Sequence, residues 1–184
     1  MEFLTALWIP ILVTGFVLFI ASSIAWTVLP HHQADFQKLP NEEEFMNAVR
    51  KMNVPAGNYL YPSMTHQEAK DPNCQARYQQ GPRGKLTTWE LPNMGRNLLL
   101  TFVLFVVIAV VIAYIAWAAL GPGAGFAKAF QITGAIGVLV FATSGQLNAI
   151  WFPRPTLNDF LDGVVFGILT GLVFGVFWPG GPSA

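Results

Sequence analysis

Four apolar stretches, each long enough to cross a bilayer as a helix, constrain this chain more than any other feature. A hydrocarbon core about 30 Å thick takes roughly 20 residues of α-helix. The stretches cover about 4–29, 98–120, 127–150 and 159–178. With 53% hydrophobic and only 11% charged residues, the 184-residue chain has too few polar side chains to cover four such helices in water. We therefore predict an all-α membrane protein, a four-transmembrane-helix bundle.

Tryptophan and basic residues predict how the bundle sits in the bilayer. Five of the six tryptophans lie at or near the end of an apolar stretch, where indole rings prefer the interface: Trp8, Trp26, Trp117, Trp151 and Trp178. Nine of the ten Lys and Arg residues fall in the first and third loops, and only Lys128 falls in the second. The positive-inside rule then predicts that residues 30–96 are cytoplasmic and that both termini are extracytoplasmic.

Residues 30–96 are polar and predict a cytoplasmic loop subdomain between the first two helices. The domain organisation is therefore 1–29 (transmembrane helix 1), 30–96 (loop subdomain) and 97–184 (transmembrane helices 2–4). Turn residues flank two extended segments, over 59–61 and 86–91, which could pair as a small β-ribbon.

A short amphipathic helix is predicted over 42–52. Asn41 has the character of an N-cap, with Glu44 as its capping-box partner. Three apolar residues recur at helical spacing and form one stripe: Phe45, Val49 and Met52. The stripe packs either on the loop and the bundle end or on a partner.

The fourth apolar stretch carries a glycine at every fourth residue: Gly163, Gly167, Gly171 and Gly175. A stripe without side chains lets another helix backbone approach closely, which supplies attraction that hydrophobicity cannot supply in lipid. The third stretch offers a matching small face that includes Gly134 and Ala135. The short link between these stretches favours packing within one chain, and packing on a second copy or another subunit is the alternative.

Two carboxylates near the start of the fourth stretch are candidates for an ion site. Asp162 is the one ionisable residue clearly inside a stretch, and Asp159 precedes it by one turn. Carboxylates within a membrane are costly and often carry protons or cations. Gln146 and Asn148 of the third stretch could add polar ligands. The alternative is a structural role at the interface, in which the carboxylates cap the helix or pair with Arg154.

Three residues after the first stretch are candidate metal ligands: His31, His32 and Asp35. Their spacing lets two of the three share a helix face. A third ligand would have to come from the loop, from His66 or Cys74, so we expect neither a metal nor another cofactor.

Motifs for catalysis and for nucleic-acid binding are missing from the sequence. It contains no G-x-S-x-G, no H-E-x-x-H and no phosphate-binding glycine loop. The net charge is zero, and no basic tract exists that could neutralise a run of phosphates. We expect neither an enzyme nor a nucleic-acid-binding protein.

One run of residues carries a resemblance to a known group. The sequence V-L-P-H-H-Q-A-D-F-Q-K-L-P at 28–40, P-A-G-N-Y-L-Y-P at 55–62, G-P at 81–82 and N-M-G at 93–95 resembles small four-span bacterial inner-membrane proteins without an assigned activity. The resemblance implies a bacterial origin and a place in the inner membrane. It implies no activity and no functional residues.

The sequence favours a non-catalytic accessory or structural subunit. Such a protein would associate with itself or with a larger membrane complex, possible examples being respiratory and photosynthetic complexes. The glycine stripe and the amphipathic helix motivate this hypothesis. The alternative is a small channel or transporter for protons or cations that uses Asp162 and Asp159.

Overall fold

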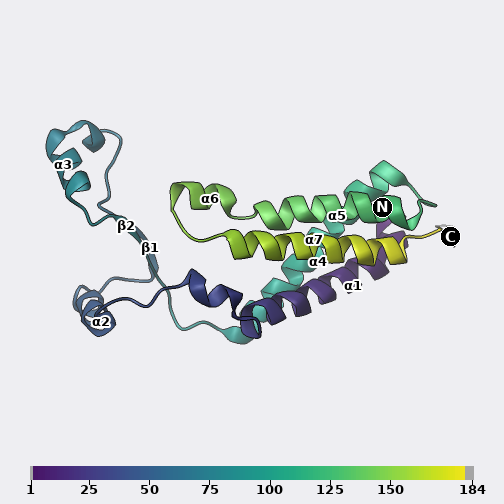
Figure 1. Ribbon diagram of the computed structural model, residues 1–184, viewed down its shortest axis with the longest axis horizontal. Helices are drawn as coiled ribbons and strands as arrows, with labels where there is room; N and C mark the ends of the chain where they lie inside the picture. Colours follow the sequence, from purple (N-terminus) through teal and green to yellow (C-terminus); the bar gives the residue numbers. More distant parts are fainter. Residues whose placement is uncertain (1, 181–184) are drawn as a thin grey trace. The chain divides into compact units, whose positions relative to one another are not determined.

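The computed structural model describes residues 2–180 of the chain. Within this range the chain forms helices joined by short loops, with one small sheet (Figure 1). The chain divides into two compact units, of which one is Gln37–Asn93 and the other is formed by the residues on either side of it. We call these the loop unit and the helical unit.

The helical unit contains the four apolar stretches. Its elements are α1 (Glu2–Thr27), the 3-10 helix η1 (Pro30–Asp35), α4 (Met94–Leu120), α5 (Phe126–Thr143), α6 (Gln146–Trp151) and α7 (Leu157–Phe177). Four segments are long and apolar enough to cross a membrane, namely α1, α4, the segment from α5 through α6, and α7. The prediction of four helices of spanning length is thereby confirmed.

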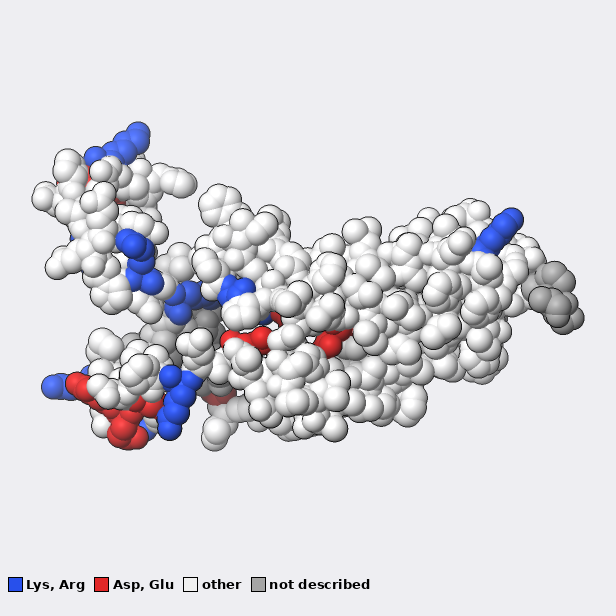
Figure 2. All heavy atoms as spheres, in the orientation of Figure 1, with Lys and Arg blue, Asp and Glu red and all other residues white. Residues whose placement is uncertain are grey.

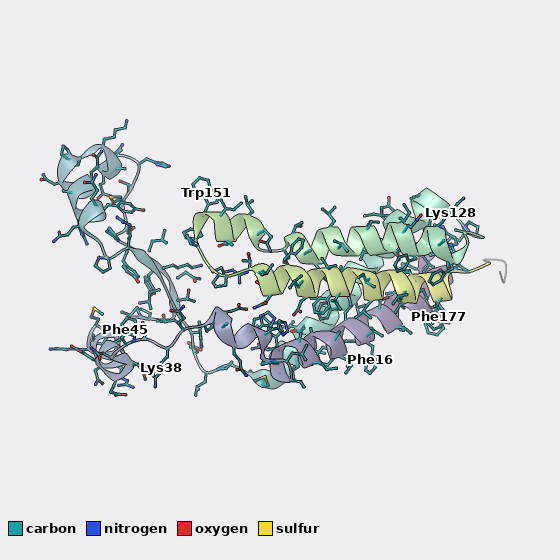
Figure 3. The ribbon with its side chains drawn as sticks, viewed as in Figure 1. Phe16, Lys38, Phe45, Lys128, Trp151 and Phe177 are labelled. Atoms are coloured by element: carbon teal, nitrogen blue, oxygen red, sulfur yellow. The ribbon has the colours of Figure 1, made fainter. Side chains whose placement is uncertain are left out.

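Large apolar side chains cover the outside of the helical unit. Leu139 and Val176 are 64% and 67% exposed, and Figure 3 shows Phe16 and Phe177 on the outer surface. On the face visible in Figure 2, the long helices are almost free of charge. A surface of this kind is suited to lipid, because large apolar patches are rare on monomeric proteins in water.

The third apolar stretch differs from its prediction. We expected one helix over 127–150, but α5 ends at Thr143 and α6 begins at Gln146. Gly145 between them has φ +82°, a left-handed conformation that glycine adopts without steric cost. The prediction of one continuous helix was wrong because apolar composition does not reveal a break at a single residue.

Helices α5 and α7 make the closest helix pair and lie side by side (Figure 1). The glycine stripe of α7 faces α5 in the same chain. A Cβ added at Gly163 would lie 2.4 Å from the Ala142 nitrogen, and one added at Gly167 would lie 2.4 Å from the Val138 nitrogen. A Cβ at Gly171 would lie 2.9 Å from the Phe130 carbonyl oxygen. The two backbones thus approach more closely than any side chain on this stripe would allow.

The remaining members of the small-residue faces lie in the same interface or beside it. Gly175 approaches the Phe126 ring of α5, and Gly134 lies opposite Gly167 and Gly171. Ala135, the neighbour of Gly134 in the chain, is exposed and lies outside this contact.

The loop unit contains the predicted helix and the two predicted strands, and it also contains two helical segments that we did not predict from the sequence. Its elements are α2 (Glu42–Lys51), β1 (Gly57–Tyr61), the 3-10 helix η2 (Glu68–Lys70), α3 (Pro72–Gln80) and β2 (Gly84–Thr88). β1 and β2 pair antiparallel, with Tyr59 opposite Leu86, so the expected β-ribbon is present. No residue of Gln37–Asn93 is buried.

The start of α2 differs from the predicted capping box. Asn41 has φ +55° and ψ +41°, and its side chain makes no capping hydrogen bond. An N-cap residue normally has an extended backbone, which aims its side chain at the first free amides. The left-handed backbone at Asn41 points the side chain elsewhere, so the prediction was right about the helix and wrong about the capping bond.

Replacing Gly167 with leucine should destabilise the α5–α7 pair. The new side chain would collide with the α5 backbone at Val138, and overpacking of this kind costs about 1–3 kcal/mol. We expect a lower denaturant midpoint in detergent for Gly167→Leu. Val176→Leu places the same residue type on the exposed face of α7 and should leave the midpoint unchanged. Equal midpoints for both variants would contradict the packing described.

Candidate functional site

A cluster of two histidines and two aspartates joins η1 to the first turns of α7. Its members are His31, His32, Asp35 and Asp162, and we call it the His–Asp cluster. His31 Nε2 lies 3.1 Å from Asp162 Oδ1, and His32 Nε2 lies 3.0 Å from Asp162 Oδ2. His32 Nδ1 lies 2.6 Å from Asp35 Oδ2. Asp162 therefore bridges both histidines, and His32 meets a carboxylate with each of its ring nitrogens.

Local sequence explains how η1 presents these side chains. Leu29 has an extended backbone, and Pro30 begins the 3-10 helix, where a fixed φ is favourable and a missing N–H has no cost. In a 3-10 helix, residues three apart lie over one another. This geometry brings His32 and Asp35 together within one turn.

Asn158 holds the cluster from α7. It lies four residues before Asp162 and hence on the same face of the helix. Its Nδ2 donates to Asp35 Oδ1 and to the His31 carbonyl oxygen, both at 2.8 Å. One amide group thus fixes the orientation of Asp35 and the backbone of η1.

Trp26 packs flat against His32. The two rings have centroids 3.9 Å apart and an interplanar angle of 7°. His32 is only 5% exposed, and the Asp162 side chain is 17% exposed. The cluster is thus largely shielded from solvent, where charge interactions are stronger than in water.

The surroundings of His32 change two pKa values. Burial acts to lower the pKa of His32, but the hydrogen bonds and charges of Asp35 and Asp162 outweigh it, so the pKa is raised. The hydrogen bond from His32 lowers the pKa of Asp35. Burial opposes this effect, and the hydrogen bond from Asn158 lowers the pKa further. Both shifts favour an ion pair between His32 and Asp35.

The structure separates the two carboxylates of the predicted ion site. Asp159 Oδ2 lies 2.8 Å from Arg154 Nη1, which is the structural pairing considered as the alternative. Asp162 pairs with the histidines instead. The two aspartates therefore have different partners although they are one turn apart.

Gln146 and Asn148 lie on α6. The Gln146 side chain accepts from Thr156 Oγ1 at 2.9 Å and donates to the Ala142 carbonyl oxygen at 3.3 Å. Asn148 is exposed. The Gln146 amide thus bridges the α5–α6 break, and its described hydrogen bonds go neither to Asp159 nor to Asp162.

An open pocket of about 300 Å³ adjoins Asp162. It is lined by Trp26, Phe141, Ser144, Gly145, Arg154, Asp159, Asp162, Gly163 and Phe166. The pocket lies near the end of α5, where Ser144 and Gly145 are part of its lining.

Sequence reasoning found the two histidines and Asp162 but did not connect them. His31 and Asp162 are 131 residues apart, and no local pattern joins them. Asn158 and Trp26 were missed as members of the site. The signals that could have suggested a built site were the three-residue spacing of His32 and Asp35 and the four-residue spacing of Asn158 and Asp162.

The comparisons with known proteins add no assignment. No protein-family model, no curated protein and no solved structure matches the chain.

The docking of η1 on α7 should depend on pH. Protonated His32 stabilises the cluster below its ordinary pKa of 6.5, and this contribution is lost as the pH rises through the raised folded-state value. Ionised Asp35 stabilises it above its ordinary pKa of 3.8, and that contribution is lost as the pH falls through the lowered value. Amide exchange over 30–36, corrected for intrinsic rates, should therefore be slowest in mildly acidic solution and faster at alkaline pH.

The matched control for this pH dependence is His32→Ala. The variant should exchange faster at mildly acidic pH and lose most of the difference between acidic and alkaline pH. A wild-type pH profile retained in the variant would contradict the role of His32.

Proposed function

We propose that the chain is a non-catalytic accessory subunit of a membrane complex, in which the four long helices anchor the loop unit and the loop unit binds a partner protein. One observation carries this proposal. The loop unit has well-formed helices and strands, yet none of its residues is buried. A segment of this size normally needs a core or a covering partner to hold such elements.

Apolar side chains of the loop unit are available for such a partner. Those more than 40% exposed include Phe45, Met52, Leu60 and Tyr61. The stripe on α2 thus remains uncovered within the loop unit, and Figure 3 shows Phe45 on this helix. The alternative that the stripe packs on the rest of the loop has no support in the contacts of that unit.

A protein partner fits the loop unit better than a lipid surface does. The first turn of α2 carries Glu42, Glu43 and Glu44, while Arg50 and Lys51 lie in its last turn. Anionic headgroups would repel the acidic end. A surface with both signs of charge around apolar residues is suited to a protein with the complementary pattern.

The glycine stripe does not support self-association. The stripe motivated the homo-oligomer hypothesis, but its glycines pack against α5 of the same chain. The proposal therefore rests on the loop unit.

The transport alternative has weaker support, although Asp159 and Asp162 line one pocket. Asp159 is paired with Arg154, Asp162 is paired with two histidines, and Gln146 and Asn148 lie on α6. These groups do not follow one path along the helices, and the close α5–α7 contact leaves no space between those two backbones.

The proposed membrane placement is the bacterial inner membrane with a cytoplasmic loop unit and both termini outside. The distribution of basic residues and the resemblance to small four-span proteins support it. Figure 3 places Lys128 and Trp151 at opposite ends of the helical unit, in agreement with loops that alternate between the two sides.

The single cysteine allows a direct test of this orientation. Cys74 lies in α3 of the loop unit and is partly exposed. A membrane-impermeant maleimide should label it in inverted vesicles and not in intact spheroplasts. A Cys74→Ser, Lys128→Cys double variant should show the opposite pattern. Labelling of Cys74 in intact spheroplasts would overturn the proposed orientation.

A photo-crosslinking amino acid at Phe45 should test partner binding. In native membranes we expect one protein adduct of defined mass, because the α2 stripe would contact the partner. Met52→Ser should reduce the adduct several-fold by removing a neighbouring apolar contact. Lys51→Ser, a change on the same helix outside the stripe, should not reduce it. Adducts with lipid alone, or no dependence on Met52, would contradict the proposal.

A further inference from the structure

We propose that His31, His32 and Asp162 form a binding site for a divalent transition-metal ion of the Zn²⁺ class. One donor atom from each residue lies within 4.8 Å of the other two. This set of two imidazole nitrogens and one carboxylate oxygen is typical of zinc and of related first-row metals. The proposal is independent of the accessory role, which rests on the loop unit.

The distances allow a metal ion to bind after a modest rearrangement of the side chains. Zinc binds imidazole nitrogen and carboxylate oxygen at about 2.0–2.2 Å, so two donors of a tetrahedral ion lie roughly 3.4 Å apart. The Nε2 atoms of His31 and His32 lie 3.1 Å and 3.0 Å from the Asp162 oxygens. The two histidines approach different oxygens of Asp162, and the three donor atoms lie within 4.8 Å of one another. Some donors must therefore move closer by up to about 1.4 Å to share one ion.

Asp35 and Asn158 hold the side chain of His32 in place: Asp35 contacts its Nδ1, and Asn158 donates to Asp35. A histidine that binds a metal commonly directs its other ring nitrogen at a carboxylate, which fixes the ring and increases its basicity. His32 has this arrangement, with Nδ1 at 2.6 Å from Asp35 Oδ2 and Nε2 toward Asp162. Asn158 in turn donates to the second oxygen of Asp35.

The contacts of His32 create a position that either a proton or a metal ion can occupy. A neutral imidazole has one N–H donor and one acceptor nitrogen. His32 meets carboxylate oxygens with both nitrogens, so either the ring carries a second proton or a cation binds between Nε2 and Asp162. A divalent ion between Nε2 and Asp162 satisfies both, and two nearby carboxylates balance its charge.

The ligand set differs from the one predicted from sequence. His31 and His32 are retained, Asp35 belongs to the second shell, and Asp162 of α7 takes the third position. His66 and Cys74, the expected additional ligands, belong to the loop unit and are not in the group. Three protein ligands leave at least one coordination position for water or another small ligand.

Metal titration of the purified full chain tests the site. The protein would be purified in detergent with a tag that lacks histidine, stripped with a chelator and titrated with Zn²⁺ and with Co²⁺. We expect one ion per chain, and visible Co²⁺ absorption of the intensity that a site with few ligands gives. His32→Ala and Asp162→Asn should each weaken binding by more than about tenfold, because they remove a ligand.

A second-shell variant and two matched controls separate the site from general effects. Asp35→Asn should weaken binding by about 10–100-fold while it leaves all three ligands in place. His66→Ala removes the remaining histidine of the chain, and Asp159→Asn removes the carboxylate one turn from Asp162. Both controls should bind the metal with the affinity of the wild type.

The outcomes separate the proposal from its alternatives. The proposed site would be overturned if the wild type bound no Zn²⁺ at micromolar concentration. It would also be overturned if His32→Ala bound Zn²⁺ as tightly as the wild type. Equal losses in His66→Ala and His32→Ala would also overturn it, since binding would then be non-specific. If His32→Ala fails to fold, as judged by its helical circular dichroism, Asp35→Asn and its Co²⁺ spectrum decide the question. None of these results affects the crosslink at Phe45.

Discussion

The close approach of the α5 and α7 backbones is the contact on which the rest of the helical unit depends. Between helices in lipid, apolar side chains gain little from each other, since acyl chains are equally apolar. Cohesion must then come from dense packing and polar contacts. The glycine stripe supplies the dense packing. Gly163, the stripe residue nearest the His–Asp cluster, directly follows Asp162 in the chain. Packing of α7 on α5 therefore sets where Asp162 stands.

The His–Asp cluster supplies polar contacts between helices. It fastens the chain that leaves α1 to the start of α7, although most contacts of α1 are with α4. Polar networks with low exposure stabilise only when each member has a partner. In this cluster every side chain has a hydrogen-bond partner, in the order Asn158, Asp35, His32, Asp162 and His31. Loss of a single member would therefore leave a polar group with low exposure unpaired.

The sequence determined the long helices well, because about 20 apolar residues have few other solutions. It failed where one residue or one distant contact decides the outcome. The break at Gly145 depends on one backbone conformation, and the link between His31 and Asp162 depends on how α1 and α7 pack. Helix α3 was predictable in principle, since Asp71 caps it and Pro72 begins it, a pattern typical of helix starts.

Arg154 gives the two carboxylates of α7 their different roles. It pairs with Asp159, which lies in the first turn of the helix, and so its guanidinium does not compete for Asp162. An arginine stays charged at any accessible pH, so a carboxylate bound to it could accept a metal only by giving up a fixed cation. Histidine can instead release its proton and become a metal ligand. Asp162 therefore has the partners that a metal site needs, whereas Asp159 has the partner that a structural ion pair needs.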